Sequence, residues 1–428
     1  MNGSSKREVS RLWIISELYY PEETSTGHHV TMIAEGLSED FDVNVLCGQP
    51  NYSKRGVDAP KAEVHNRVNI RRLPGTRLNK NVIPFRIINM LTLGVPILFT
   101  SLFRFRKGDS ALVVTTPPNL PFAVALASLV RGVEYTLLIH DNYPDALVAA
   151  GKASPDSVLV RAWRFCNRWL FKHASRIIVL GRDMKELIDR EAEGLDVPVV
   201  YIPNWAELDL IKPMDRSENR LLKQLGLEDK FVFLYAGNMS YTSELEGLIY
   251  CAERLSENRD IHFVFLGDGA RKSELVGKVN RKKLNNVTIL DPKPRSDQPE
   301  FLNACDVAVV ALVEGMRGVS VPSRIYNALA AGKPILGVTE AGSELTRMID
   351  ESGVGWWVPP GQFDDLLRTI KQLASEKENV RKRGRLARAE VEHKYSFDIA
   401  IEKYRMTFAA NRSPEATCAR RPESGVSA

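Results

Sequence analysis

The sequence lacks the short motifs that mark several large classes of protein. Its 428 residues hold five cysteines with no CxxC pair, so they indicate neither a zinc ribbon nor a dithiol redox centre. The glycines form neither GxGxxG nor GxxxxGK[ST], which disfavours a dinucleotide-dependent oxidoreductase and a P-loop protein. The cysteines are scattered, mostly within apolar runs, and we expect free, buried thiols in a reducing cytosol.

Export signals and strong overall charge are also missing. The N-terminus "MNGSSKREVSRLWIISELYY" has no signal-peptide core, because its apolar run is short and ends at Glu17. The net charge is only +5 at pH 7, and neither zinc-finger spacing nor a basic helix is present, so no nucleic-acid partner is expected. The length favours two domains. We therefore expect a cytoplasmic two-domain protein.

The positive charge is unevenly distributed along the chain. Residues 51–110 contain twelve Lys or Arg against three Asp or Glu, which indicates an anionic partner such as phosphate or a membrane surface. The same region holds an uncharged apolar run, 87–103, between Arg86 and Arg104. Basic flanks favour a helix lying on the bilayer over one that spans it, and a plain buried helix remains an alternative.

Short apolar runs alternate with helical patterns along the chain. This alternation predicts a doubly wound α/β fold, repeated in two tandem halves around a hinge in the Pro-containing stretch 197–213. An amphipathic terminal helix is expected at 395–410, and the polar tail 411–428 is expected to be disordered. The stretch 197–213 itself reads as a strand that runs into an irregular segment. Val30, Ile33, Ala34 and Leu37 are spaced as one face of a helix, and a further helix is expected at about 243–255. The other runs assigned to strands are 12–16, 42–48, 111–116, 134–141, 176–181, 231–238, 261–269, 287–290, 307–312 and 334–338.

Glycines and polar residues follow several of these strands. "YAGN" places Gly237 and Asn238 after one strand, and "LGDG" places Gly267 and Gly269 after another. In parallel sheets ligands bind at the carboxyl ends of strands, where glycine lets the backbone come close. Each of these turns alone is a weak signal, and two in one half favour a ligand site there.

The stretch 314–344 predicts a helix with an unusual start. Pro322 suits the first turn, Ser320 or Ser323 can cap it, and Gly332 ends it. Arg324 then lies in the first turn, where a cation opposes the helix dipole. Its position makes sense if an anion binds there; the alternative is that Arg324 pairs with Glu314 or another acid.

Histidines and one aspartate mark the first half. His140 and Asp141 lie at the end of a predicted strand, the place for groups that face a cleft. A core position explains His140 equally well, whereas an unpaired buried carboxylate at Asp141 would be costly. His28 and His29 are adjacent without a third ligand at useful spacing, so no metal site is expected.

Several of these stretches together resemble glycosyltransferase family 4. They are "GVSVPSRIYNALAAGKPIL", "YAGN", "FLGDG" and "SGVGWWVPPGQFDDLLRTI", in the family's order. The resemblance covers nearly the whole chain, the "PSR…LAAGKP" block is its specific part, and the chain is most similar to the bacterial subgroup that builds O-antigen, capsule and exopolysaccharide units.

The resemblance implies a GT-B fold: two Rossmann-like domains facing a cleft, with the C-terminal helix crossing back to the first. Residues 1–205 and 395–410 would bind the acceptor, and 206–394 the nucleotide sugar. The implied reaction is retaining transfer of a hexose-type sugar from a nucleoside diphosphate to a polyprenyl-diphosphate-linked saccharide. It would need no metal or cofactor, since positioned cations and N–H groups can stabilise the leaving diphosphate. The enzyme would lie on the inner face of the cytoplasmic membrane.

The resemblance also assigns site residues, by matching positions of this sequence to the family's motifs. His140, Asp141 and Arg324 would be catalytic, and "PEETSTGHH" would be an acceptor-side loop through Thr26, Gly27 and His28. The segment "DPKPRSD" would lie near the base. The residues implied to bind the nucleotide sugar are Gly237, Asn238, Gly267, Gly269, Glu314, Arg317, Ser323, Arg324 and Asn327.

Two positions depart from the family pattern. The family often has two glutamates eight residues apart, the second holding the ribose, but here those positions are Val319 and Asn327. The family's phosphate-binding Arg and Lys are replaced by Asn238 and Glu246, so Arg324, with Arg317, would bear more of the phosphate binding.

Two other functions fit the same fold class. A GT-B sugar-nucleotide epimerase would require an acid-rich hydrolytic cleft, which the sequence does not show clearly. A two-domain solute-binding protein is disfavoured by the missing export signal and by the basic stretch.

Overall fold

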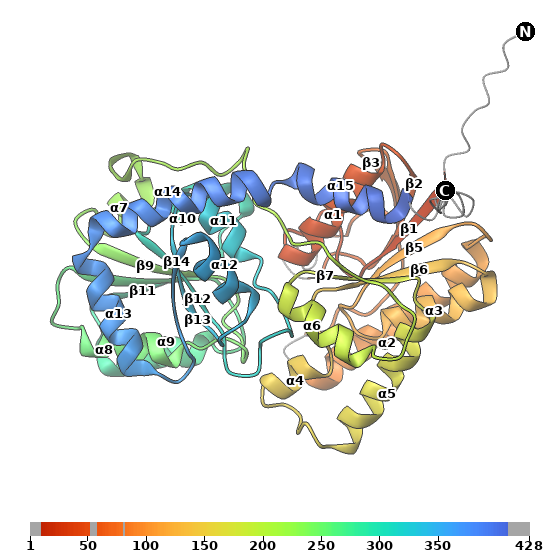
Figure 1. Cartoon of the computed structure of the whole chain (residues 1–428), viewed down its shortest axis with the longest axis horizontal. Coiled ribbons are helices and arrows are strands. Elements are labelled where there is room, and N and C mark those ends of the chain that lie inside the picture. The colour runs from red at the N-terminus through yellow and green to blue at the C-terminus, as the bar shows by residue number, and fades with distance from the viewer. Residues whose placement is uncertain (1–9, 52–57, 80–81, 410–428) are drawn as a thin grey trace, which may run out of the picture.

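The computed structural model describes residues 10–51, 58–79 and 82–409, which form two lobes side by side (Figure 1). The first lobe is built on an eight-stranded sheet in the order β3-β4-β2-β1-β5-β6-β7-β8, parallel except for the β3–β4 pair. Its strands are β1 (Arg11–Ile15), β2 (Asp42–Cys47), β3 (Ala62–His65), β4 (Val68–Arg72), β5 (Ser110–Val114), β6 (Glu134–Ile139), β7 (Arg176–Val179) and β8 (Val199–Tyr201).

The longer helices cover this sheet because they carry apolar stripes toward it. In α1, the predicted face of Val30, Ile33, Ala34 and Leu37 is buried. The first-lobe helices are α1 (Ser25–Leu37), α2 (Ile83–Arg104), α3 (Leu120–Arg131), α4 (Asp145–Ala149), α5 (Val158–His173) and α6 (Arg182–Glu191).

The second lobe repeats the plan with a six-stranded parallel sheet in the order β11-β10-β9-β12-β13-β14. Its strands are β9 (Phe231–Ala236), β10 (Ile261–Leu266), β11 (Val287–Leu290), β12 (Val307–Ala311), β13 (Ile335–Val338) and β14 (Gly355–Val358). Its helices are α7 (Arg220–Leu225), α8 (Glu246–Arg254), α9 (Lys272–Lys282), α10 (Gln298–Asn303), α11 (Arg324–Ala330), α12 (Glu344–Ser352) and α13 (Phe363–Ser375), with 3-10 turns at Arg216–Glu218 and Arg295–Asp297.

Strand order reverses between β1 and β5 in the first sheet and between β9 and β12 in the second. In open α/β sheets ligands bind outside the carboxyl ends of the strands at such reversals. The loops that follow β1 and β5 in the first sheet and β9 and β12 in the second are therefore expected to carry the site, and the loop after β6 lies next to that of β5.

The C-terminal helices cross from the second lobe to the first, as predicted. α14 (Lys377–Lys394) packs on α11, and α15 (Phe397–Ala409) packs on α1 (Figure 1). The contact with α1 is close, because a Cβ on Gly36 would lie 2.6 Å from Ile401. Arg405 adds an ion pair to Asp40 at 3.0 Å.

Most predicted strands are present within one to three residues of their expected ends. β3, β4 and β14 were not predicted, and the helix expected at 243–255 begins only at Glu246. The expectation of buried cysteines is correct for Cys47, Cys251 and Cys305 and wrong for Cys166, which is exposed on α5. Cys418 and the tail 411–428 lie outside the described residues.

The apolar stretch 87–103 forms most of α2, and it is not a plain core helix. Only one stripe packs inward, through Asn89, Leu93, Ile97 and Ser101, while Phe103 is 83% exposed. Among the described residues, Pro84–Arg104 is the one helix whose length and composition would allow it to cross a membrane, and only 28% of its most apolar 18-residue window is buried.

Candidate active site

The two glycine turns of the second lobe meet, because β9 and β10 are neighbours. A Cβ on Gly267 would lie 2.1 Å from the Gly237 carbonyl oxygen, and one on Gly269 would lie 2.5 Å from Asn238 Oδ1. Only glycine fits such spacing. All four predicted residues of these turns therefore gather at the carboxyl edge of the second sheet.

Arg324 lies directly against this edge. A Cβ on Gly237 would stand 2.5 Å from Arg324 Nη1, and the guanidinium lies over the ring of Tyr235, 4.8 Å from its centroid. Its one protein hydrogen bond is a long donation to the Ala236 carbonyl at 3.4 Å. Within residues 10–51, 58–79 and 82–409 no carboxylate lies within ion-pair distance of it. The alternative pairing with Glu314 is wrong, and the cation is available to an anion.

The start of α11 differs from the prediction. Pro322 precedes the helix instead of occupying its first turn, and Ser323 stands at the N-cap without a capping hydrogen bond. Ser323 Oγ instead lies 2.5 Å from Ser25 Oγ of the first lobe. The other capping candidate, Ser320, forms a β-bridge with Asp141. Gly332 does follow the helix end with φ of +67°. Contacts between the lobes, and not a local capping hydrogen bond, hold the start of α11 in place.

His140 and Asp141 are brought to the same place from the first lobe. They follow β6, and the Asn142 N–H donates to the Val319 carbonyl at 2.8 Å, so this segment runs against the loop before α11. Burial lowers the pKa of His140 to about 4, so the imidazole is neutral at pH 7. Burial raises the pKa of Asp141, an effect opposed by a hydrogen bond from Ser320. His140 Nε2 is buried and has no partner among the described residues.

The acceptor-side loop forms the start of α1. Thr24 caps the helix by accepting from the Gly27 N–H at 3.3 Å, and a Cβ on Gly27 would lie 3.2 Å from the Glu22 carbonyl. Thr26 is partly exposed in the first turn. Burial lowers the pKa of His28 to about 4, with nearby Arg295 as the second cause, so this histidine is also neutral.

Within the described residues, neither Glu314 nor Arg317 forms a hydrogen bond or an ion pair with Arg324. Glu314 is exposed, and Arg317 is nearly half exposed, 3.5 Å from Glu186 of α6. Glu246, where the family has a cation, forms ion pairs with Arg271 and Lys278. The two arginines proposed for phosphate binding are therefore not equivalent. Arg317 has a carboxylate partner, whereas Arg324 has none among the described residues.

Asn327 is fully engaged within the protein. Its amide donates to Gln298 Oε1 at 2.8 Å and to Glu207 Oε1 at 3.2 Å, while its oxygen accepts from the Glu207 N–H at 3.0 Å. Glu207 and Arg295 also form an ion pair here. Arg295 lies in "DPKPRSD", the segment expected near the base, but it was not singled out as a site residue. Glu207 was missed because it sits in no recognisable motif and is far from Arg295 in the chain.

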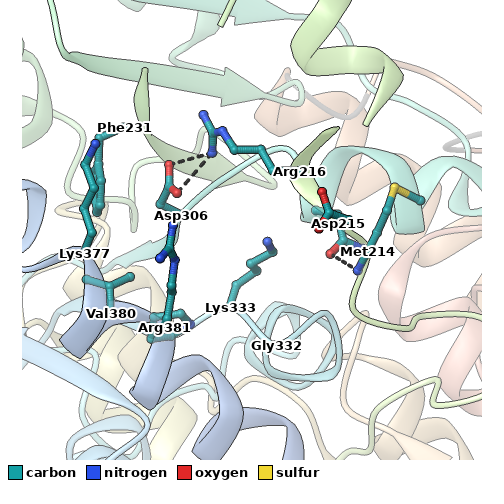
Figure 2. A pocket seen from close by; sticks show the side chains of 12 residues that line it. Met214, Asp215, Arg216, Phe231, Asp306, Gly332, Lys333, Lys377, Val380 and Arg381 are labelled. Atoms are coloured by element: carbon teal, nitrogen blue, oxygen red, sulfur yellow. Dashed lines mark hydrogen bonds and ion pairs between the residues drawn. The ribbon is translucent and has the colours of Figure 1, made fainter. Parts of the chain in front are cut away.

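A separate cavity of about 350 Å³ lies at the opposite edge of the second sheet (Figure 2). It is bordered by Phe231, Asp306 and Pro334, which stand at or just before the amino ends of β9, β12 and β13. Figure 2 shows Arg216 in an ion pair with Asp306 there. Because this cavity lies at the amino ends of the strands, it is not part of the site built by Arg324 and the glycine turns at their carboxyl ends.

No group of three His, Cys, Asp or Glu side chains that could hold a metal ion occurs in the described part of the chain. Between the lobes the described residues bring together a guanidinium without a carboxylate partner beside close glycine turns, and a neutral imidazole and a carboxylic acid on the segment that runs against the loop before α11. That arrangement suits binding and stabilising an anionic leaving group. Two parallel α/β lobes with such a cleft define the GT-B class of glycosyltransferase.

Comparison with known proteins identifies the family. The glycosyl transferase 4-like domain matches residues 25–205, and the glycosyl transferases group 1 domain matches 217–390. The probable glycosyltransferase WbjE of Pseudomonas aeruginosa is 30% identical over 408 residues, covering 92% of this chain and 97% of WbjE. The chain therefore belongs to glycosyltransferase family 4, as the resemblance predicted.

Other similar proteins agree in fold. The putative colanic acid biosynthesis glycosyl transferase WcaI of Escherichia coli is 25% identical, covering 83% of this chain and 89% of WcaI. Sucrose-phosphate synthase from Thermosynechococcus elongatus superposes with a TM-score of 0.76 at 16% identity, covering 94% of this chain and all of that one. Anabaena HepE, solved with UDP and glucose, superposes with a TM-score of 0.72 at 14% identity, covering 94% of this chain and 100% of HepE.

Proposed function

We propose that this glycosyltransferase moves a hexose-type sugar from a nucleoside diphosphate to a lipid-linked saccharide in cell-surface polysaccharide synthesis, with retention of anomeric configuration. The observation that carries the proposal is Arg324, a cation that has no carboxylate partner in the described part of the chain and is held against Gly237 at the edge of the second sheet. The names of WcaI and of the HepE complex support polysaccharide synthesis and a nucleotide-sugar donor.

The donor diphosphate would lie between Arg324 and the turns at Gly237 and Gly267. Departure of the diphosphate breaks the bond from its oxygen to the anomeric carbon and leaves negative charge on that oxygen. A guanidinium can stabilise this charge through two parallel N–H donors, which is why one well-placed arginine can take over from the missing family cations. No metal or other cofactor has a role in this proposal.

Asp141 is the proposed acceptor of the proton that leaves the acceptor hydroxyl as its oxygen bonds to the anomeric carbon. Burial raises the pKa of Asp141, so its carboxylate is a better base than a solvated aspartate. His140 stays neutral because burial lowers its pKa to about 4, and it can therefore orient a sugar hydroxyl without adding charge. Thr26, Gly27 and His28 would border the acceptor.

The acceptor is proposed to be lipid-linked because one face of the first lobe suits an anionic bilayer. Exposed apolar side chains project from α2, α3 and α5, which lie together in Figure 1. Exposed Arg104, Arg106, Lys107 and Arg131 border them. We call this face the three-helix surface; its apolar members are Phe85, Ile87, Ile88, Leu91, Val95, Phe99, Phe103, Leu126, Leu129, Val130, Val158, Leu159 and Phe165.

The function is tested by a donor screen followed by a transfer assay. A thermal-shift screen of UDP, GDP, dTDP and CMP sugars selects the donor, since a ligand that binds only the native state raises its stability. The selected donor is then incubated with membrane lipid extract, and the anomeric configuration of the product is read by NMR. Transfer with retention is expected. Binding of no nucleotide sugar, or transfer with inversion, would contradict the proposal.

A further inference from the structure

Glu207 lies in the segment that joins the two lobes, and its carboxylate lies between His28 of the first lobe and Arg295 and Asn327 of the second. The side chain is only 14% exposed. Its Oε1 receives the Arg295 guanidinium and the Asn327 amide, the latter at 3.2 Å. The Glu207 N–H donates to Asn327 Oδ1 at 3.0 Å, so side chain and backbone are both fixed.

One oxygen of this fixed carboxylate has acceptor capacity left. Oε2 of Glu207 accepts no hydrogen bond from any residue of 10–51, 58–79 or 82–409. His28 Nε2 lies 3.4 Å from Oε1 without forming a hydrogen bond. An ionised carboxylate can accept about four hydrogen bonds, and hydroxyl groups are suitable donors.

Helix α11 sets the distance between Arg324 and the Glu207 carboxylate, because it carries both Arg324 and the Asn327 that binds Glu207. Arg324 and Asn327 are three residues apart on α11, so they share one face with Cβ atoms about 5–6 Å apart. In a nucleoside diphosphate the ribose follows directly on the phosphates. A diphosphate at Arg324 would therefore place the ribose hydroxyls about one helical turn away, beside the group that Asn327 holds.

We propose that Glu207 is the ribose-binding carboxylate of this protein, held in place by Asn327 and Arg295 and accepting from the 2′- and 3′-hydroxyls of the donor. This inference rests on the proposed function, because it assumes a nucleoside-diphosphate donor at Arg324. It also explains why position 327 carries an amide, since an asparagine can both donate to Glu207 and accept from its backbone.

The charge balance supports the assignment. Burial lowers the pKa of Arg295 to about 10, so this guanidinium is still charged at pH 7 and lies against the Glu207 carboxylate. Both side chains are more than four-fifths shielded from solvent. A hydrogen bond from a ribose hydroxyl to such a carboxylate is stronger than one made in water.

The test compares ribose and deoxyribose ligands. UDP, GDP and ADP are titrated into the full-length protein by calorimetry, and the one that binds is compared with its 2′,3′-dideoxy form. Wild type is expected to bind the dideoxy form about 10- to 100-fold more weakly. Glu207→Gln is expected to weaken binding of the ribonucleotide and to reduce this discrimination to less than threefold. Glu253→Gln, an exposed partner of Lys282 on α8, is the matched control and should discriminate like wild type.

The possible outcomes distinguish failure of the Glu207 assignment from failure of the proposed glycosyltransferase function. Equal binding of the two forms by wild type overturns the inference, and so does undiminished discrimination by a Glu207→Gln protein whose thermal midpoint is normal. If Glu207→Gln does not fold, the wild-type comparison together with Asn327→Ala decides, and unchanged discrimination in Asn327→Ala overturns the inference. Failure of these three nucleotides, and of the dTDP and CMP sugars of the donor screen, to bind wild type overturns the proposed donor site itself.

Discussion

The carboxylate of Asp183 accepts a hydrogen bond from the Gly318 N–H at 2.9 Å, and it joins helix α6 of the first lobe to the loop that leads into α11. Asp183 is only 4% exposed, and it also accepts from the Met184 N–H at 2.8 Å. The same loop is bonded to the first lobe through Asn142 and Val319. The position of Arg324 therefore depends on both lobes.

Asp183→Ala should destabilise the protein and weaken donor binding. The change leaves two buried N–H groups without partners, at a cost of about 1–3 kcal/mol each. Thermal unfolding and calorimetric titration of the selected nucleoside diphosphate measure the two effects. Asp189→Ala is the matched control, since Asp189 is an exposed carboxylate on the same helix, paired with Lys185 at 2.7 Å. Equal stability of the two variants would rule out the joining role of Asp183.

Glu191→Gln should stabilise the protein at alkaline pH. Burial, with Asp145 nearby, raises the pKa of Glu191 to about 7 from an ordinary 4.5. The folded state thus favours the protonated form, so wild type loses stability as the pH rises from 4.5 through 7. A neutral glutamine avoids that loss, and at pH 8 the gain should approach about 3 kcal/mol.

Denaturant unfolding at pH 4, 6 and 8 measures the Glu191 effect. The difference between variant and wild type should be absent at pH 4 and largest at pH 8. Glu193→Gln, two residues further on and exposed, should behave like wild type at all three values. A constant difference across the range would show that the pKa of Glu191 is not responsible.

Removing two rings from the three-helix surface should abolish binding to anionic vesicles. Phe99 and Phe103 are 54% and 83% exposed on α2, and burying one such ring contributes about 1.5–3 kcal/mol. Phe99→Ser with Phe103→Ser should weaken co-sedimentation with phosphatidylglycerol vesicles at least about tenfold. Added salt should weaken wild-type binding too, because the basic rim is screened.

The control for that experiment is Val64→Ser on strand β3, which changes an apolar side chain that is 69% exposed outside this surface. It should bind vesicles as wild type does. If wild type ignores anionic vesicles, or if the double variant binds them unchanged, the three-helix surface is not a membrane-docking face.

Asp141→Asn should lower turnover without weakening donor binding. Asparagine keeps the shape of the side chain but cannot take the proton of the acceptor hydroxyl, and general-base catalysis contributes about 10²- to 10⁴-fold in rate. The kcat of transfer and the Kd of the nucleoside diphosphate are measured separately. A normal kcat would remove Asp141 from the reaction, and a Kd raised in proportion to the loss would assign it to binding.

The fold was predictable from sequence wherever strands are fully buried. β1, β9 and β12 are short apolar runs between turns, and the pattern places each of them within a residue or two. β3 and β4 were missed because their residues alternate between exposed and buried positions and include charges, as expected near a sheet edge. β14, with the sequence Gly-Trp-Trp-Val, was also not predicted.

The site was predictable only where its residues share a local motif. Arg324 and the turns at Gly237 and Gly267 could be found because each follows or precedes a recognisable element. The pairing of Glu207 with Arg295 could not, although Arg295 lies in the "DPKPRSD" segment expected near the base, since the two residues are 88 positions apart in the chain. The capping role expected of Ser323 was wrong because its partner, Ser25, is 298 residues away.

The most direct test of the account is the affinity of Arg324→Ala for the nucleoside diphosphate selected in the screen. A charged hydrogen bond contributes about 1.5–3 kcal/mol, so the Kd should rise about 10- to 100-fold while the thermal midpoint of the free protein stays near that of wild type. Arg254→Ala is the control, because Arg254 also lies over a tyrosine ring, 5.3 Å from the centroid of Tyr250, but on α8. Its Kd should equal that of wild type. An Arg324→Ala protein that binds the diphosphate with full affinity would contradict the assignment of this cleft as the donor site.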